Sequence, residues 1–235
     1  MIYAYNEYFK KELPIVATYD NGTKAIYSDL LKPLAKRLNS RSAGGKKQNV
    51  ILIEGRTGSG KSNVGIQLCM AMDKNWKIGP NYIYSLKDFS AKLKHPELSQ
   101  SKISLVDEGS VVLNSMNSQR KEDVLMAMAF DTLRSFGLST VICIPNRKHL
   151  NKRIVENHID FLIKCPTHSP VSGYSPVGMY ELYSHEYRDW GRDYFHPIGM
   201  SLCNCISPDV DREYQRIKRE HQMEFLTRLP DMDVM

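Results

Sequence analysis

The residues with the clearest chemical potential lie at positions 55–62, where the chain reads Gly-Arg-Thr-Gly-Ser-Gly-Lys-Ser. Glycines tolerate positive φ angles, so backbone N–H groups in such a stretch can close around an anion. The spacing fits the Walker A pattern, in which Lys61 reaches the β- and γ-phosphates of ATP and the Ser62 hydroxyl ligates Mg²⁺. The residues expected to contact the nucleotide are Gly55, Arg56, Thr57, Gly58, Ser59, Gly60, Lys61, Ser62 and Asn63.

Two flanking elements are expected to position this loop. Residues 50–53 form a short apolar, mostly β-branched run of the kind that a parallel sheet buries on both faces. Residues 64–72 form an apolar stretch that can continue as a helix, whose N-terminus favours negative charge. A strand, a loop and a helix in this order are the context that the motif requires. The alternative is a glycine-rich surface turn beside an accidental Gly-Lys-Ser.

A second pair of chemically capable residues, Asp107 and Glu108, follows an apolar run at 103–106. In a Walker B element Asp107 would hold Mg²⁺, usually through water, and Glu108 would orient and activate the attacking water. A strand that ends in two acids is common by itself. Here it follows the glycine-rich loop by about 45 residues, with room for one strand and one helix between, and this spacing favours the catalytic interpretation.

The next apolar, β-branched run, residues 138–144, predicts another strand, and a polar residue, Asn146, stands just beyond its tip. It resembles the polar sensor residue that one large division of P-loop ATPases carries at this position, next to the γ-phosphate. Residues 147–153 then place four cations in seven positions, at the sheet edge where open α/β folds bind ligands. This cluster faces either DNA or a neighbouring subunit's nucleotide, or it is a solvated helix start.

Length and composition favour one α/β domain with a small appendage, because 235 residues suffice for a substantial core. The longest apolar runs are too short to span a bilayer, and the first residues are too polar for a signal peptide. Five cysteines at irregular spacing do not suggest a disulfide framework and fit a reducing compartment. We therefore expect a cytoplasmic protein, in the host cytoplasm if the source is viral.

Three segments are expected: a basic arm and linker at 1–48, a P-loop core at 49–165, and a hairpin-plus-helix extension at 166–235. The arm holds nine Lys and Arg against four Asp and Glu, which accounts for most of the net charge of +6. We expect it to lie outside the sheet, with a short or kinked helix at 24–38, and to contact nucleic acid or an acidic partner, or simply to be solvated. A charged helix is expected at 208–229.

Three cysteines and one histidine in the C-terminal half of the chain are either the ligands of a zinc ion or isolated side chains. Cys165, His168, Cys203 and Cys205 could supply four zinc ligands. The Cys-x-Cys spacing is not that of the usual Cys-x-x-Cys knuckle, so isolated thiols are the favoured interpretation.

Four segments together resemble the additional-strand, catalytic-glutamate division of the P-loop NTPases. They are residues 55–62, 106–108, 130–137 and 144–147. Within this division the chain is most similar to the FtsK/HerA group and to the related packaging and Zot-like assembly ATPases of viruses and phages. The resemblance covers residues 49 to about 164, roughly half of the chain. An Asn-Lys-x-Asp motif is not present, which argues against a GTPase.

The resemblance implies a three-layer α/β fold and Mg²⁺-dependent ATP hydrolysis by a homo-oligomeric ring that moves DNA, with double-stranded DNA in a viral or plasmid packaging role as the preferred substrate. A viral portal or capsid protein is then a further partner. In such rings an arginine from a neighbouring subunit completes the site; Arg134 is the first candidate, followed by Arg147 and Arg120. HerA-like proteins commonly carry glutamine where this chain has Asn146. An assembly ATPase that acts on a protein or membrane partner without DNA therefore stays open, as does a nucleotide switch, against which Glu108 argues.

Overall fold

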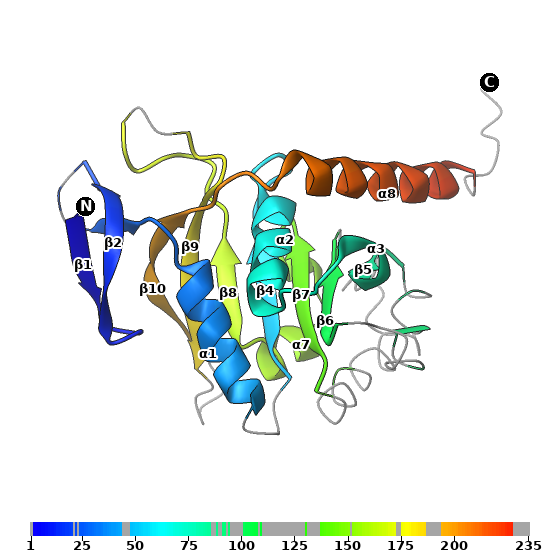
Figure 1. Ribbon diagram of the computed structural model, residues 1–235, viewed down its shortest axis with the longest axis horizontal. Coiled ribbons are helices and arrows are strands. Elements are labelled where there is room, and N and C mark those ends of the chain that lie inside the picture. The colour runs from blue at the N-terminus through cyan, green and yellow to red at the C-terminus, as the bar shows by residue number, and fades with distance from the viewer. Residues whose placement is uncertain are drawn as a thin grey trace.

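The computed structural model describes residues 2–20, 22, 24–43, 48–85, 88, 91–92, 94, 101–107, 109, 130, 137–150, 152–172, 175–186 and 194–227. Ten strands form one sheet in the order β1-β2-β3-β10-β9-β8-β4-β7-β6-β5 (Figure 1). Five neighbouring strands pair in parallel throughout and form the core: β4 (Val50–Glu54), β5 (Tyr82–Ile83), β6 (Ile103–Val106), β7 (Ser139–Ile144) and β8 (Phe161–Lys164). The α/β class and the mainly parallel sheet predicted from the sequence are confirmed.

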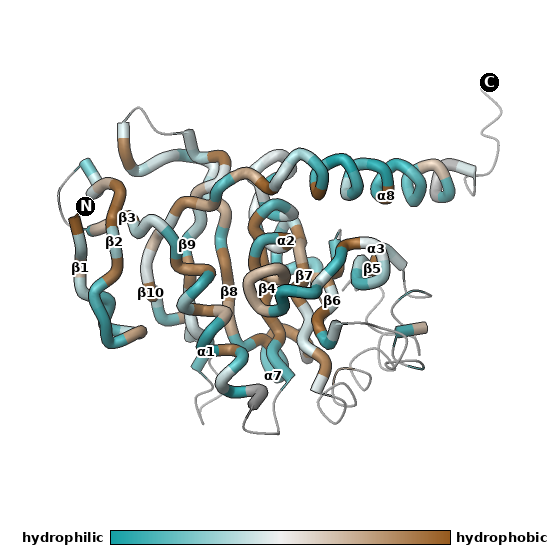
Figure 2. The backbone as a smooth tube through the Cα atoms, viewed as in Figure 1, coloured by the Kyte–Doolittle hydropathy of each residue, from teal (hydrophilic) through white to brown (hydrophobic). Residues whose placement is uncertain are grey.

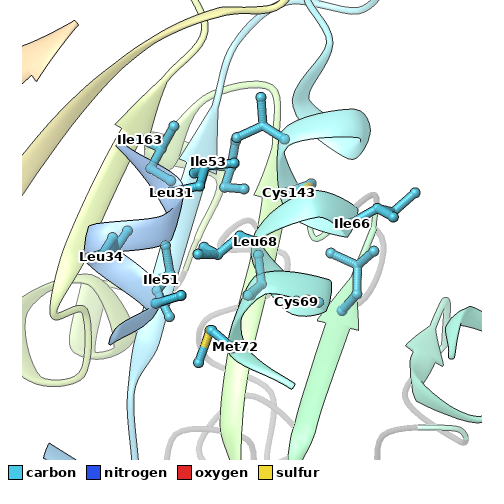
Figure 3. Packing of buried hydrophobic residues seen from close by; sticks show 14 of the residues in the cluster. Leu31, Leu34, Ile51, Ile53, Ile66, Leu68, Cys69, Met72, Cys143 and Ile163 are labelled. Atoms are coloured by element: carbon cyan, nitrogen blue, oxygen red, sulfur yellow. The ribbon is translucent and has the colours of Figure 1, made fainter. Parts of the chain in front are cut away.

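Helices cover both faces of this parallel core. On one face α1 (Leu31–Ala43) and α2 (Lys61–Met72) share an apolar layer with alternate residues of β4, Ile51 and Ile53 (Figure 3). On the other face Val50 and Leu52 pack in a second layer with the short helix α7 (Lys152–Asn157). Since residues 50–53 of β4 are buried on both faces of the sheet, their apolar sequence is what their position requires.

The N-terminal segment does not lie outside the sheet, so that expectation was wrong. Residues 1–48 contribute β1 (Ile2–Asn6), β2 (Lys11–Thr18) and β3 (Ala25–Tyr27) to the sheet. β3 pairs in parallel with β10 (Tyr194–Leu202), which follows it by more than 160 residues. Two buried hydroxyl groups, those of Tyr180 and Ser201, accept from the backbone N–H of Leu30 at 3.0 and 3.2 Å and so fix the exit from β3. Such distant pairing leaves no local pattern in the sequence.

Several basic side chains of this segment are used within the fold. Arg41 pairs with Asp160 at 2.9 Å, and Arg37 lies over the ring of Tyr8 at 4.4 Å. The helix α1 begins at Leu31, whose N–H donates to the Asp29 carboxylate at 2.8 Å, rather than near residue 24. Pro33 thus falls in the first turn, where a proline is tolerated. Part of the positive charge of this segment is therefore engaged in contacts within the fold.

The C-terminal segment completes the sheet and then crosses its end. β9 (Met179–Glu186) pairs antiparallel with β8 and with β10, and forms the expected hairpin. The helix α8 (Pro208–Leu226) follows, close to the predicted span, and lies across the end of the sheet at which α2 begins (Figure 1). It is polar along most of its length (Figure 2), and Tyr214 and Ile217 are buried apolar residues on it. Within the described ranges, no helix has the length and apolar character needed to cross a bilayer.

Burial of cysteine in the core predicts a loss of stability at alkaline pH. Cys69 lies on α2 and is fully buried, and this burial raises the pKa of its thiol. The folded state therefore keeps the thiol proton when the unfolded chain, whose thiols ionise above about pH 8.5, has begun to lose it. The free energy of unfolding is unaffected by this group below that pH and falls above it, by about 1.4 kcal/mol per pH unit.

Urea unfolding between about pH 8 and pH 10 tests this expectation. The Cys69→Ala variant should lose stability more slowly with rising pH than the wild type does. Cys205→Ala, which alters an exposed cysteine, is the matched control and should follow the wild-type slope. Parallel slopes for Cys69→Ala and the wild type would contradict the prediction.

Candidate nucleotide-binding site

The glycine-rich loop joins β4 to α2 with the backbone geometry that its sequence predicts. Gly60 stands before the first residue of α2 with φ 89°, a left-handed conformation that favours glycine. A Cβ atom on Gly55 would lie 2.6 Å from Ser59 Oγ and 2.8 Å from the Cys165 carbonyl oxygen, so only glycine fits there. Arg56, Thr57 and Gly58 are exposed along the outer side of the turn. The loop is thus a compact turn, exposed on one side, that leads directly into the N-terminus of α2.

Lys61 and Ser62 begin α2 and point to two different partners. Lys61 Nζ donates to the Arg56 carbonyl oxygen at 2.9 Å, across the loop. Ser62 Oγ donates to the carboxylate of Asp107, at 3.0 Å from Oδ1 and 3.2 Å from Oδ2.

Asp107 follows β6 directly and is the most strongly bonded side chain of the site. It is 1% exposed. Besides Ser62, it accepts from two buried tyrosines, Tyr82 at 3.2 Å and Tyr214 at 2.8 Å, both through Oδ2. Burial first, and then the charge of Asp107, raise the pKa of both phenols. Both therefore stay protonated and act as donors to the carboxylate.

Ser62 and Asp107 form a donor set that suits Mg²⁺. Hydroxyl and carboxylate oxygens are the ligands that this hard cation prefers, and neighbouring ligands of an octahedral Mg²⁺ lie about 3 Å apart. The two oxygens here are 3.0 Å apart. The spacing therefore fits a shared ion, with Ser62 and Asp107 as the residues that would hold it.

Asn63, expected to contact the nucleotide, lines the site and also holds a distant segment through its side chain. Its amide donates to the Asn204 carbonyl oxygen at 2.9 Å, and its Oδ1 accepts from the Ile206 N–H at 2.9 Å. Gln67, one turn further along α2, also donates to Asn204. The start of α2 thus anchors the chain just before α8.

This anchoring places α8 beside the loop and creates a cleft between them. The cleft has a volume of about 680 Å³, within the usual range for a small-molecule site. Its walls come from the loop and α2 on one side and from residues 205–222 on the other. The lining residues are Thr57, Gly58, Gly60, Lys61, Ser62, Asn63, Cys205, Ile206, Pro208, Asp211, Tyr214, Gln215, Lys218, Arg219 and Gln222.

Asn146 borders a second cleft, of about 400 Å³, on the other side of the loop's first residues. It follows β7, is exposed, and its Oδ1 accepts from the Lys148 N–H at 3.0 Å. The same cleft includes Arg147, whose backbone N–H donates to Glu54 at 3.4 Å. The structure therefore does not bring Asn146 into the cleft that contains Lys61.

Three predicted residues lie outside the part of the chain that the structure describes: Glu108, Arg134 and Arg120. The four zinc candidates are placed. Cys165 is buried, Cys205 and His168 are exposed, and Cys203 is intermediate. Among the described residues no three His, Cys, Asp or Glu side chains are grouped to hold a metal ion.

Sequence reasoning missed Tyr82 and Tyr214, which bond Asp107, and Lys218, which bonds Tyr214. One signal was available: Tyr214, Ile217 and His221 stand at positions i, i+3 and i+7, a narrow stripe on one helix face. That stripe indicates a contact but not its partner.

Comparison with known proteins gave distant structural likenesses. No protein-family model matches the chain, and no curated protein sequence matches it significantly. Among solved structures, the genome packaging NTPase B204 of Sulfolobus turreted icosahedral virus 2, in complex with AMPPCP, is 14% identical, with TM-score 0.43 over 63% of this chain and 97% of that one. The N-terminal domain of zonular occludens toxin from Neisseria meningitidis is 15% identical, with TM-score 0.40 over 69% and 96%. EssC (ATPases 2 and 3) from Geobacillus thermodenitrificans is 12% identical, with TM-score 0.42 over 75% and 44%.

These neighbours are of the kinds that the sequence resemblance named. The assignment of the fold rests on the chain itself: a glycine-rich loop between a buried parallel strand and a helix, and an acidic residue at the end of β6, two strands away from β4 in the sheet. The chain has the fold of a P-loop NTPase.

Proposed function

We propose that this protein is a Mg²⁺-dependent ATPase that translocates double-stranded DNA as a homo-oligomeric ring, in the packaging of a viral genome. The observation that carries the ATPase part is the direct contact between Ser62 and Asp107 beside the glycine-rich loop. In P-loop enzymes these two positions share the metal ion, and the lysine beside them neutralises phosphate charge.

The roles of the residues follow from their positions. The loop N–H groups and the N-terminus of α2 bind the phosphates, and Lys61 exchanges its Arg56 carbonyl partner for a phosphate oxygen. When bound, Mg²⁺ would neutralise charge on the β- and γ-phosphates. Asp107 keeps its carboxylate fixed through the donors Tyr82 and Tyr214. Glu108, next in the chain, is proposed to orient the attacking water.

The DNA part of the proposal is supported by the cations around the second cleft. Arg56, Arg147, Lys148 and Lys164 line it, together with Glu54 and Glu181. Arg147 and Lys164 lie 3.9 and 4.0 Å from Glu54. Four cations against two acids at the carboxyl edge of a parallel sheet suit a polyanion. Arg134 is proposed as the finger for a neighbouring subunit's nucleotide, with Arg147 and Arg120 as the second and third candidates.

A second candidate is an assembly ATPase that acts on a protein partner without DNA, and the β1–β2 hairpin favours it. This hairpin forms one end of the sheet (Figure 1) and exposes large apolar side chains. Ile2 is 71% exposed, Tyr3 54% and Tyr5 52%. An edge strand with such a surface suits contact with another chain.

Steady-state ATPase assays with and without double-stranded DNA, at low and moderate salt, separate the two candidates. A translocase should show several-fold stimulation by DNA that fades as salt rises, because phosphate contacts release counterions. Lys61→Ala is the control for hydrolysis by this site. Hydrolysis that is indifferent to DNA at both salt concentrations contradicts the translocase and supports the assembly ATPase.

A further inference from the structure

The helix α8 contacts the predicted catalytic centre through Tyr214, and its other side chains that line the cleft have no role in the proposed mechanism. It is held at one end by Asn63, which bonds the 204–206 segment. Further along, the ring of His221 stacks on Tyr84 with ring centroids 5.0 Å apart. The helix α8 also contacts α3 (Ile78–Asn81), which Tyr82 follows directly in the chain. Both ends of the segment that faces the cleft are therefore fixed to the core.

A chain of hydrogen bonds leads from α8 to the metal-binding carboxylate. Lys218 Nζ donates to the Tyr214 hydroxyl at 3.2 Å, and that hydroxyl donates to Asp107 Oδ2 at 2.8 Å. Asp107 in turn accepts from Ser62. The ammonium group of Lys218 is thus one hydroxyl away from the carboxylate that would share Mg²⁺ with Ser62.

The charges on the two walls of the cleft suit a phosphate chain. Lys61 contributes a cation from the loop side, and Lys218 and Arg219 contribute two from α8. Asp211 is the acidic residue on the α8 wall, and its Oδ1 accepts from the Gln215 amide at 3.3 Å. A ligand between the walls therefore meets cations from both sides.

We propose that α8 forms the second wall of the nucleotide site within the same subunit, and that Lys218 binds the terminal phosphate of a nucleoside triphosphate opposite the glycine-rich loop. Tyr214 is then a positioning residue, which orients both Asp107 and Lys218. This inference rests on the proposed function, because it assumes that the cleft binds ATP. It assigns to α8 a second contact with the terminal phosphate, in addition to that of Lys61, and so a further discrimination between triphosphate and diphosphate.

Titration with fluorescent analogues of ATP and ADP, in Mg²⁺, tests the proposal by affinity rather than by turnover. Lys218→Met should weaken binding of the ATP analogue by about tenfold or more, the range of a charge-assisted hydrogen bond, and should change binding of the ADP analogue much less. Arg216→Met is the matched control: it removes the same charge from the same helix, but Arg216 is exposed and pairs with Glu220 at 2.7 Å. It should leave both affinities unchanged.

The outcomes separate failure of this inference from failure of the proposed function. Equal weakening of both analogues by Lys218→Met, or no weakening, overturns the role of Lys218 as long as Lys61→Ala still abolishes binding. If the Lys61→Ala variant binds the ATP analogue with the wild-type affinity, the proposed function itself is wrong.

Hydrogen exchange of the backbone amides of α8 gives an independent readout. Binding of ATP with Mg²⁺ should slow exchange in residues 208–226, because the phosphate chain joins α8 to the loop. In Tyr214→Phe, which keeps the ring but removes the hydroxyl, the slowing should be smaller. Faster exchange in α8 on ATP binding would overturn the proposal, since the nucleotide would then displace the helix.

Discussion

The Glu108→Gln variant should lower kcat for ATP hydrolysis by about 10²- to 10⁴-fold, the usual contribution of a general base. Its affinity for ATP should stay within about threefold of the wild type, because a water-activating residue contributes little to ground-state binding. Glutamine keeps the size of the side chain but cannot accept the proton. The position follows Asp107, whose carboxylate the structure places beside Ser62.

Two measurements check this expectation on one sample: steady-state phosphate release, and titration with a fluorescent ATP analogue. Lys61→Ala provides the contrasting control, because it should lose binding as well as turnover. Turnover at the wild-type rate in Glu108→Gln would show that another residue orients the water.

Asp107→Ala should lose Mg²⁺-dependent hydrolysis by at least about 10³-fold and should also destabilise the fold by about 2–4 kcal/mol. The carboxylate is buried and accepts from Ser62, Tyr82 and Tyr214. Alanine removes the acceptor and leaves two buried phenol hydroxyls without their partner. Asp107→Asn keeps a carbonyl oxygen as acceptor, so it should lose activity to a similar extent but retain a free energy of unfolding within about 1 kcal/mol of the wild type.

Urea unfolding and the ATPase assay, applied to both variants, separate the two roles of the carboxylate. Asp209→Ala, an exposed acid on α8 paired with Arg212, controls for loss of one negative charge. An Asp107→Asn variant that hydrolysed ATP normally would exclude Asp107 as the metal ligand. An Asp107→Ala variant as stable as the wild type would show that the tyrosines find other partners.

The parts of the fold that the sequence predicted are those with local signals. The strand β4, the loop and α2 follow one another directly, and the glycine positions and apolar runs define all three. The strand β6 and the acid Asp107 are also contiguous. In both cases the physical requirement, such as a left-handed Gly60 before the helix, acts on residues that are neighbours in the chain.

The parts that could not be predicted depend on pairings between distant residues. Along β2 only Leu13 is buried, so this strand shows no clear alternation. The three-residue strand β3 pairs with β2 and with the distant β10. Asn63 fits the pattern of a nucleotide contact, but its side chain bonds residue 204. Tyr214 bonds Asp107, although the two residues are 107 positions apart in the sequence. A single sequence states which residues can bond, and the tertiary fold decides which of them meet.

The attachment of Asn63 to the 204–206 segment couples α8 to the phosphate loop. Asn63 stands directly after Ser62, so a displacement of the loop at the phosphates is passed to the start of α8 through two hydrogen bonds of 2.9 Å. The helix is about 28 Å long, and its contacts with α3 and Tyr84 hold it to the core further along. It thus connects the loop, which follows the interior strand β4, to the region around β5 at the edge of the sheet.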